Sequence, residues 1–177
     1  MRAFIAMELP DAFWHETVDL ARQLGEHVPG RYMKSDTYHL TLAFLGNIDD
    51  ATRGLAMDAI DAACAGIAPI EFRSDGLGKF GRARDATLWL GVNPDPALLE
   101  LARRLRAELD ARQVPYDPKP FRPHITLARR ARIPRGALPA LAFPNDATAT
   151  DITLFKSELS HEGATYKPLY TVTLEGA

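Results

Sequence analysis

The chain has 177 residues, and its 46% hydrophobic and 25% charged content fits one globular domain or two small lobes that share a core. The formal net charge of −2 argues against a general nucleic-acid coat protein, which would carry a broad basic surface. The single cysteine, Cys64, excludes an internal disulfide and a cysteine metal cluster. No apolar run reaches the roughly 20 residues of a membrane span and the N-terminus lacks a signal-peptide core, so we expect a cytoplasmic protein.

The first third of the chain alternates between strand and helix patterns. Apolar residues recur at every second position in the first strand and at helical spacing in the helix after it. Asp49 and Asp50 are candidate N-caps for a second helix. The predicted elements are a strand at 2–9, a helix from 11 to about 27, a strand at 37–46 and a helix that ends near Cys64.

The rest of the chain adds strands and one strongly amphipathic helix. That helix covers residues 94–112, where Leu98, Leu101, Leu105 and Leu109 follow helical spacing. The predicted strands are 69–80 and 86–93, joined by a turn, then 123–130, 149–160 and 165–174, with an irregular proline-rich segment at 133–144 and a turn at 161–163.

The pattern His-x-Thr-Leu occurs in two of the predicted strands, 85 residues apart. His39 and Thr41 belong to the first copy, and His124 and Thr126 belong to the second. Because alternate side chains of a strand point to opposite faces, each histidine shares a face with its threonine, and the aliphatic residues between them face the other side. By the same alternation, Ala43 and Ala128 fall on the histidine face. A lone strand histidine is more often a surface residue than a catalyst, but a matched pair favours one shared site.

The repeated motif also predicts the architecture. A helix precedes each motif strand, and the surrounding strands are joined by turns that suit antiparallel pairing. We expect an α+β fold in two related halves, in which residues 1–177 form a single bilobal domain. Its two pseudo-symmetric lobes would be antiparallel sheets backed by helices, and the two motifs would meet in a central cleft.

Basic residues gather around the second motif. Arg129 and Arg130 follow it directly, and their position beside His124 favours local binding of a small anion such as one phosphate. An ordinary solvated face is the alternative. Strand alternation places Arg130 on the His124 face, so Arg129 can reach the site only if the strand bulges or ends. The other members of this group are Lys119, Arg122, Arg132 and Arg135, and Arg82 and Arg84 form a smaller group.

Phe4 allows two interpretations. It shares a strand face with the polar residues Arg2 and Glu8 and could stack on a terminal base, but core packing is the more common role of a phenylalanine. The sequence contains no His-Glu-x-x-His pattern, aspartate pair or cysteine cluster that would favour a metal centre. We therefore expect neither a metal nor a cofactor.

Several longer strings resemble the two-histidine phosphoesterase superfamily, and more narrowly the bacterial RNA 2′,3′-cyclic phosphodiesterases, also called 2′-5′ RNA ligases. These strings are Phe4-Ile5-Ala6-Met7-Glu8-Leu9-Pro10, residues 39–46, residues 121–129 and the tail from Ser157 to Leu169. The resemblance implies two lobes around a cleft, no metal, and hydrolysis of RNA 2′,3′-cyclic phosphate ends to 2′-phosphomonoesters. It also implies a weak reverse activity that joins a 2′-phosphate-type end to a 5′-hydroxyl.

The chemistry needs a base that deprotonates water and an acid that protonates the departing ribose oxygen. Imidazole suits both tasks, because its ordinary pKa near 6.5 makes either form accessible at neutral pH. By the resemblance, His39 is the proton donor and His124 the proton acceptor, whereas the sequence alone leaves the roles interchangeable. Thr41 and Thr126 would donate hydrogen bonds to the phosphate oxygens. The family pattern favours Arg129 as a further contact.

Other functions fit the same residues. The physiological direction could be 2′-5′ RNA joining, or the cleft could be a non-catalytic module that binds RNA ends or nucleotides. Small cyclic nucleotides are alternative substrates. We expect a monomer with no membrane partner.

Overall fold

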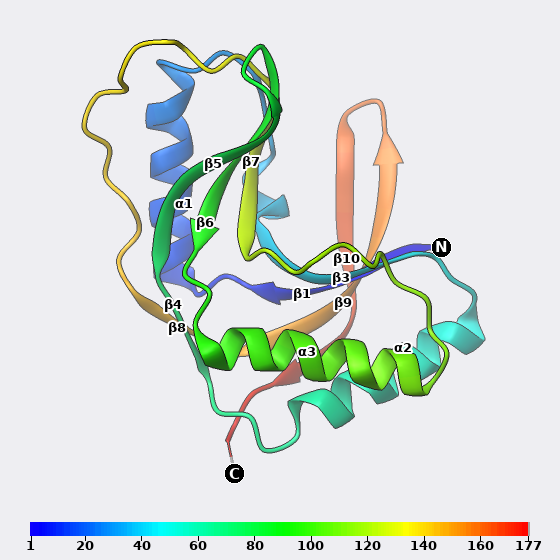
Figure 1. Cartoon of the computed structure of the whole chain (residues 1–177). Helices are drawn as coiled ribbons and strands as arrows, with labels where there is room; N and C mark the ends of the chain where they lie inside the picture. Colours follow the sequence, from blue (N-terminus) through cyan, green and yellow to red (C-terminus); the bar gives the residue numbers. More distant parts are fainter. Residues whose placement is uncertain (177) are drawn as a thin grey trace.

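The structure, a computed structural model, describes residues 1–176 (Figure 1). Within this range no helix is long and apolar enough to cross a bilayer. The elements in chain order are β1 (Arg2–Glu8), α1 (Asp11–Gly25), β2 (Arg31–Tyr32), the 3-10 helix η1 (Ser35–Thr37), β3 (His39–Asn47), α2 (Asp50–Cys64), β4 (Ile70–Phe72), β5 (Ser74–Arg82), β6 (Asp85–Val92), α3 (Pro96–Ala111), β7 (His124–Ala131), β8 (Ala147–Ala149), β9 (Asp151–Ser160) and β10 (Gly163–Thr173).

Two four-stranded antiparallel sheets form the framework. Their strand orders are β10-β9-β1-β3 and β2-β7-β6-β5, and β4 pairs with β8 in a separate two-stranded ribbon. The two motif strands, β3 and β7, approach each other where the sheets meet. The predicted α+β class, with two lobes and the motifs brought together, is confirmed.

The two lobes are not built from two successive halves of the chain, because segments are exchanged between the two sheets. Strand β9 returns from the C-terminal part to pair with β1, and β2 crosses to pair with β7. The helices are exchanged as well: α1 lies beside the β5-β6-β7 sheet, whereas α2 and α3 lie together against the other sheet (Figure 1). One buried cluster continues through both lobes, with members such as Ile5, Leu40, Leu90 and Ile125. Segment exchange and this shared core fix the relative position of the two motif strands.

Both motif strands bulge directly after the threonine. In the first lobe, β1 residues Ile5 and Ala6 pair with Ala43 and Thr41, so that Leu42 is an extra residue. In the second lobe, β6 pairs with Ala128 and Thr126 of β7, which leaves Leu127 as the extra residue. Such a bulge shifts the alternation of side chains by one position. Ala43 and Ala128 are therefore buried with the leucines, at 1% and 0% exposure, instead of facing the histidine side as strict alternation predicts.

Most predicted elements lie within a few residues of their expected bounds. The side chain of Asp49 caps α2 by accepting a hydrogen bond from the Thr52 backbone N–H at 2.8 Å. The predicted strand at 69–80 is divided into β4 and β5. The short elements β2, η1 and β8 were not predicted, because two or three residues carry no periodicity that a sequence pattern can show.

Candidate functional site

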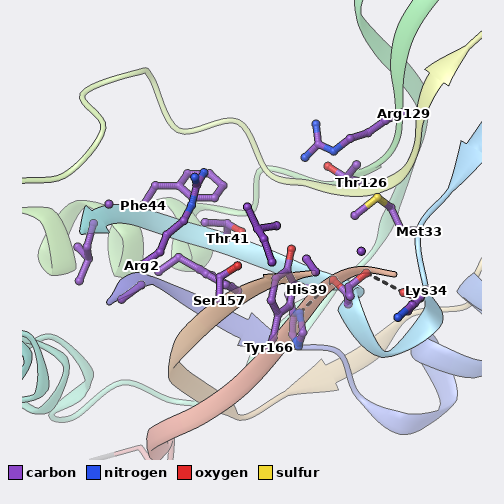
Figure 2. Close-up of a pocket in the computed structure, with 18 of the residues that line it drawn as sticks. Arg2, Met33, Lys34, His39, Thr41, Phe44, Thr126, Arg129, Ser157 and Tyr166 are labelled. Atoms are coloured by element: carbon purple, nitrogen blue, oxygen red, sulfur yellow. Dashed lines mark hydrogen bonds between the residues drawn. The ribbon is translucent and has the colours of Figure 1, made fainter. Parts of the chain in front are cut away.

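A cavity of about 1220 Å³ lies between the lobes and contains both motifs. His39 and Thr41 reach it from β3, and His124 and Thr126 reach it from β7. Figure 2 shows His39, Thr41 and Thr126 around one space, with Arg129 on the β7 side and Tyr166 beside His39. The predicted central cleft with four motif side chains is thus present in the structure.

Each histidine ring is held by a carbonyl two residues before it in the chain. Nδ1 of His39 lies 3.0 Å from the carbonyl oxygen of Thr37, and Nδ1 of His124 lies 2.6 Å from that of Arg122. A carbonyl only accepts, so each Nδ1 carries the proton in these bonds. In the neutral ring this leaves Nε2 with a free lone pair, and in the charged ring Nε2 carries a proton to donate. Both rings can therefore exchange a proton through the same atom.

Burial favours the neutral form of both rings. It lowers the pKa of His39 to about 4, although the Thr37 carbonyl and the Asp36 carboxylate partly oppose the shift. The pKa of His124 is lowered mainly by burial and then by the positive charges of Arg122 and Arg129, while the hydrogen bond to the Arg122 carbonyl opposes this. An anionic phosphate bound between the rings would reverse part of these shifts. The two rings therefore acquire a stronger tendency to hold protons when a phosphate is present.

Aromatic side chains support both histidines. The His39 ring lies 4.5 Å from the ring centre of Phe155 and 5.6 Å from that of Tyr166. The His124 ring meets Phe80 edge-on at 5.1 Å and lies 5.7 Å from Trp89. These contacts restrict ring rotation, so each imidazole keeps the orientation set by its carbonyl partner.

Phe4 belongs to the support of the first histidine. Its side chain is 5% exposed, stacks on Phe155 at 5.3 Å and meets Tyr166 edge-on at 4.8 Å. Phe4 also lines the cavity, but these two contacts leave little of its ring exposed there. Of the two interpretations of Phe4, packing is the one that matches its surroundings.

The structure separates the two neighbouring arginines of the second motif. Arg129 lines the cavity, because the bulge at Leu127 turns it to the His124 side. Arg130 has a positive φ of 54° and lies 3.6 Å from Asp85 on the outer turn, away from the cavity. The expectation from strict alternation is therefore corrected, since Arg130 does not line the site and Arg129 does.

Some cavity residues were not singled out by the sequence. Phe44 of β3 is 52% exposed and lines the cavity, so it offers the free aromatic face that Phe4 lacks. Tyr166 lies between the lobes, and burial raises the pKa of its hydroxyl, which stays protonated and able to donate. The bulge at Leu42 turns Phe44 toward the cavity. For Tyr166, the only signal in the sequence was its position in the tail string that resembles the phosphodiesterase family. Three further cations, Arg2, Arg31 and Lys34, line the same cavity.

The remaining candidates lie outside the motif centre. Arg122 covers the Trp89 ring at 5.5 Å, and His161 lines the cavity from the β9–β10 turn. Among residues 1–176, no group of three or more His, Cys, Asp or Glu side chains could hold a metal ion.

Comparison with known proteins gives consistent matches. The sequence profile of the 2′-5′ RNA ligase superfamily matches residues 9–161. An RNA 2′,3′-cyclic phosphodiesterase of Thermotoga maritima is 29% identical, over 99% of this chain and 97% of that protein. A crystal structure from Thermus thermophilus superposes with a TM-score of 0.84 at 28% identity, covering 99% of both chains. Escherichia coli LigT complexed with 3′-AMP gives a TM-score of 0.81 at 29% identity, over 98% of this chain and 97% of the other.

Proposed function

The chain belongs to the 2′-5′ RNA ligase superfamily and is an RNA 2′,3′-cyclic phosphodiesterase, and we propose that His39 and His124 are the acid and the base of its reaction. The observation that carries this proposal is the matched tethering of both rings. Each Nδ1 is bonded to a backbone carbonyl, so that Nε2 is left for proton exchange in a shared cavity.

The proposed hydrolysis needs one proton transfer at each side of the phosphorus. Nε2 of His124 takes a proton from water while the water oxygen bonds to phosphorus. The bond from phosphorus to the ribose 3′-oxygen breaks, and protonated His39 gives its proton to that oxygen. The products are a 3′-hydroxyl and a 2′-phosphomonoester. The rings then hold the opposite protonation states, and exchange with solvent restores them.

The developing charge on the non-bridging oxygens is stabilised by donors from both lobes. Thr41 and Thr126 provide hydroxyl groups, and Arg129 provides a charge-assisted contact. With protons carried by histidine and charge met by these donors, we expect no metal requirement. The exposed ring of Phe44 can stack on the base of the terminal nucleotide.

Turnover of an oligonucleotide with a 2′,3′-cyclic phosphate end tests this function. We expect full activity in excess EDTA and a 2′-phosphate product, identified by phosphorus NMR. Loss of activity in EDTA with recovery on adding a divalent ion would contradict the mechanism. A 3′-phosphate product would contradict the assignment of the leaving oxygen.

RNA joining is a second candidate, since the superfamily is named for it. The same acid–base pair can join RNA when a 5′-hydroxyl replaces water as the nucleophile on the cyclic phosphate, so that a 2′-5′ linkage forms and the 3′-oxygen again leaves. Measuring hydrolysis and joining on one pair of RNA fragments separates the two. A non-catalytic binding module would not need two histidines held by backbone carbonyls, so we do not favour it. Small cyclic nucleotides remain alternative substrates, since they contain the same cyclic phosphate group. We further propose that the protein is cytoplasmic and acts as one bilobal monomer. One chain supplies every side chain that this mechanism uses, which supports the monomer.

A further inference from the structure

We propose a second anion-binding site, at the β5–β6 turn, that binds backbone phosphates of the RNA substrate away from its cyclic end. Its guanidinium groups are those of Arg82, Arg84, Arg132 and Arg135. The identity of the ligand rests on the proposed function, whereas the presence of an anion site rests on the arrangement of these side chains.

The site is a concave surface with a defined backbone. These four arginines, with Ala83 and Ile133, line a cavity of about 590 Å³. The backbone N–H of Ile133 donates to the carbonyl of Ala83 at 2.6 Å, which joins the turn to the segment after β7. The N–H of Arg132 donates to the carbonyl of Pro29 at 2.8 Å, which holds the same segment to the loop before β2. In Figure 1 this turn and the end of β7 lie together at the end of the lobe farthest from α3. Two chain segments distant in sequence therefore present their arginines together.

The charges at this turn are not neutralised by the protein. Among residues 1–176, none of the four arginines has a carboxylate oxygen within 4.0 Å, and all four side chains are exposed. Asp85, the carboxylate of the turn, lies beside Arg130 instead. On the helices, by contrast, Arg22 and Arg103 have acidic partners three residues away. Like charges held around one hollow repel each other, and a bound polyanion relieves that repulsion.

The short distance along β7 from the catalytic cavity favours RNA as the anion. Arg129 lines the catalytic cavity and Arg132 lines the second one, so three residues, or about 10 Å of extended chain, separate them. From His124 to Arg132 the chain spans at most about 26 Å, since the bulge at Leu127 shortens a fully extended strand. A stacked strand carries one phosphate per about 3.4 Å, so this span corresponds to roughly eight nucleotides. A dinucleotide bound by its cyclic end falls short of the second site, and a longer RNA can reach it.

Binding of two RNA lengths tests the proposal directly. Fluorescence anisotropy would compare RNA of about 12 nucleotides with a dinucleotide, both ending in a 2′-phosphate so that no turnover occurs. The variant is Arg84→Gln with Arg132→Gln, and the matched control is Arg22→Gln with Arg103→Gln, which removes the same charge from the helices. We expect the variant to bind the long RNA at least tenfold more weakly than the wild type and to bind the dinucleotide with unchanged affinity. The slope of log Kd against log salt for the long RNA should decrease by about 1.4, because two phosphate contacts are lost.

The outcomes separate this proposal from the proposed function. The second site would be overturned if the variant lost the same affinity for both RNAs, if the salt slope for the long RNA stayed unchanged, or if the control variant weakened binding of the long RNA equally. Unchanged affinity of the variant for the long RNA would overturn the proposal even if the variant lost affinity for inorganic phosphate. Hydrolysis of the cyclic dinucleotide by the wild type is a separate readout, and its absence would contradict the proposed function while the binding comparison still stands.

Discussion

Phe44 and Arg129 occupy equivalent positions in the two lobes, each five residues after the histidine of its motif and each lining the same cavity. The bulges at Leu42 and Leu127 bring them there. One lobe thus presents an aromatic face and the other a cation at matching positions. The two motifs are alike, and this difference gives the bound nucleotide a direction in the cavity: its base would stack on Phe44 and its phosphate would lie near Arg129.

Substitution of this pair should divide base binding from phosphate stabilisation. Phe44→Ala removes a stacking surface, which is worth about 1–3 kcal/mol per base, so KM for a cyclic dinucleotide should rise while kcat changes little. Arg129→Gln removes a charge-assisted bond, which should lower kcat/KM by about 1.5–3 kcal/mol. Steady-state kinetics on a cyclic ribose phosphate without a base provides the control. Phe44→Ala should leave that substrate unaffected, and an equal loss on both substrates would contradict base stacking.

The histidine roles can be separated by the leaving atom. His39→Gln and His124→Gln should each lower kcat about 10²–10⁴-fold on an ordinary cyclic end. If His39 protonates the leaving oxygen, a substrate with sulfur at the 3′ position should restore much of the activity of His39→Gln, because a thiolate departs without a proton. The same substrate should not restore His124→Gln. The opposite pattern would exchange the two roles, and circular dichroism would establish that both variants are folded.

The pH dependence follows from the lowered pKa values of the free enzyme. The pair holds a single proton mainly between a pKa of about 4 for His39 and the lowered pKa of His124. That proton resides mostly on His124, and the productive tautomer, with the proton on His39, is a minor form whose population follows the same pH dependence. The profile of kcat/KM should therefore reach its maximum below the ordinary imidazole pKa of about 6.5. The kcat profile should lie at higher pH, because the bound phosphate raises both pKa values. A kcat/KM maximum above about 6.5 would show that burial does not control the free rings.

Much of the site was predictable from the sequence, and the limits have physical causes. The motif alternation identified His39 and Thr41 as a pair because it depends only on neighbours along one strand. Alternation then failed at Ala43 and Arg130, since a bulge is fixed by pairing with β1 or β6, which the sequence does not reveal. Phe4 and Phe44 lie in similar apolar strings, and only packing distinguishes the buried ring from the exposed one.

The arginines around the second motif show the same limit. The sequence treats them as one basic group, whereas the structure places Arg129 in the catalytic cavity and Arg132 in the second one. The second cavity also takes Arg82 and Arg84 from a turn about fifty residues earlier, through the backbone bond between Ile133 and Ala83. A contact of this range cannot be read from local composition.

Acid should destabilise the fold through His39. Its pKa is about 4 when folded and near 6.5 when unfolded, so the unfolded chain binds more protons between these values. The free energy of unfolding should therefore decrease as pH falls from about 6.5 to 4, by at most about 1.4 kcal/mol per pH unit for this group. Urea titrations across that range would measure the slope. In His39→Gln the slope should be smaller, and an unchanged slope would assign the acid sensitivity to other groups.

Gly78 should be essential for the support of His124. A Cβ at this position of β5 would lie 2.1 Å from the Trp89 ring, and that ring packs against His124. Gly78→Ala must therefore displace Trp89, at a cost of about 1–3 kcal/mol in the free energy of unfolding. The matched control is Gly54→Ala on α2, where nothing lies within 4 Å of a new Cβ and better helix propensity should stabilise the fold by up to about 1 kcal/mol. Denaturant titration gives both values. NMR titration of the His124 ring should show an altered pKa in Gly78→Ala alone, because displacement of the indole changes the burial of the imidazole. If Gly78→Ala unfolded like the control and left the His124 titration unchanged, Trp89 would have no part in holding the ring.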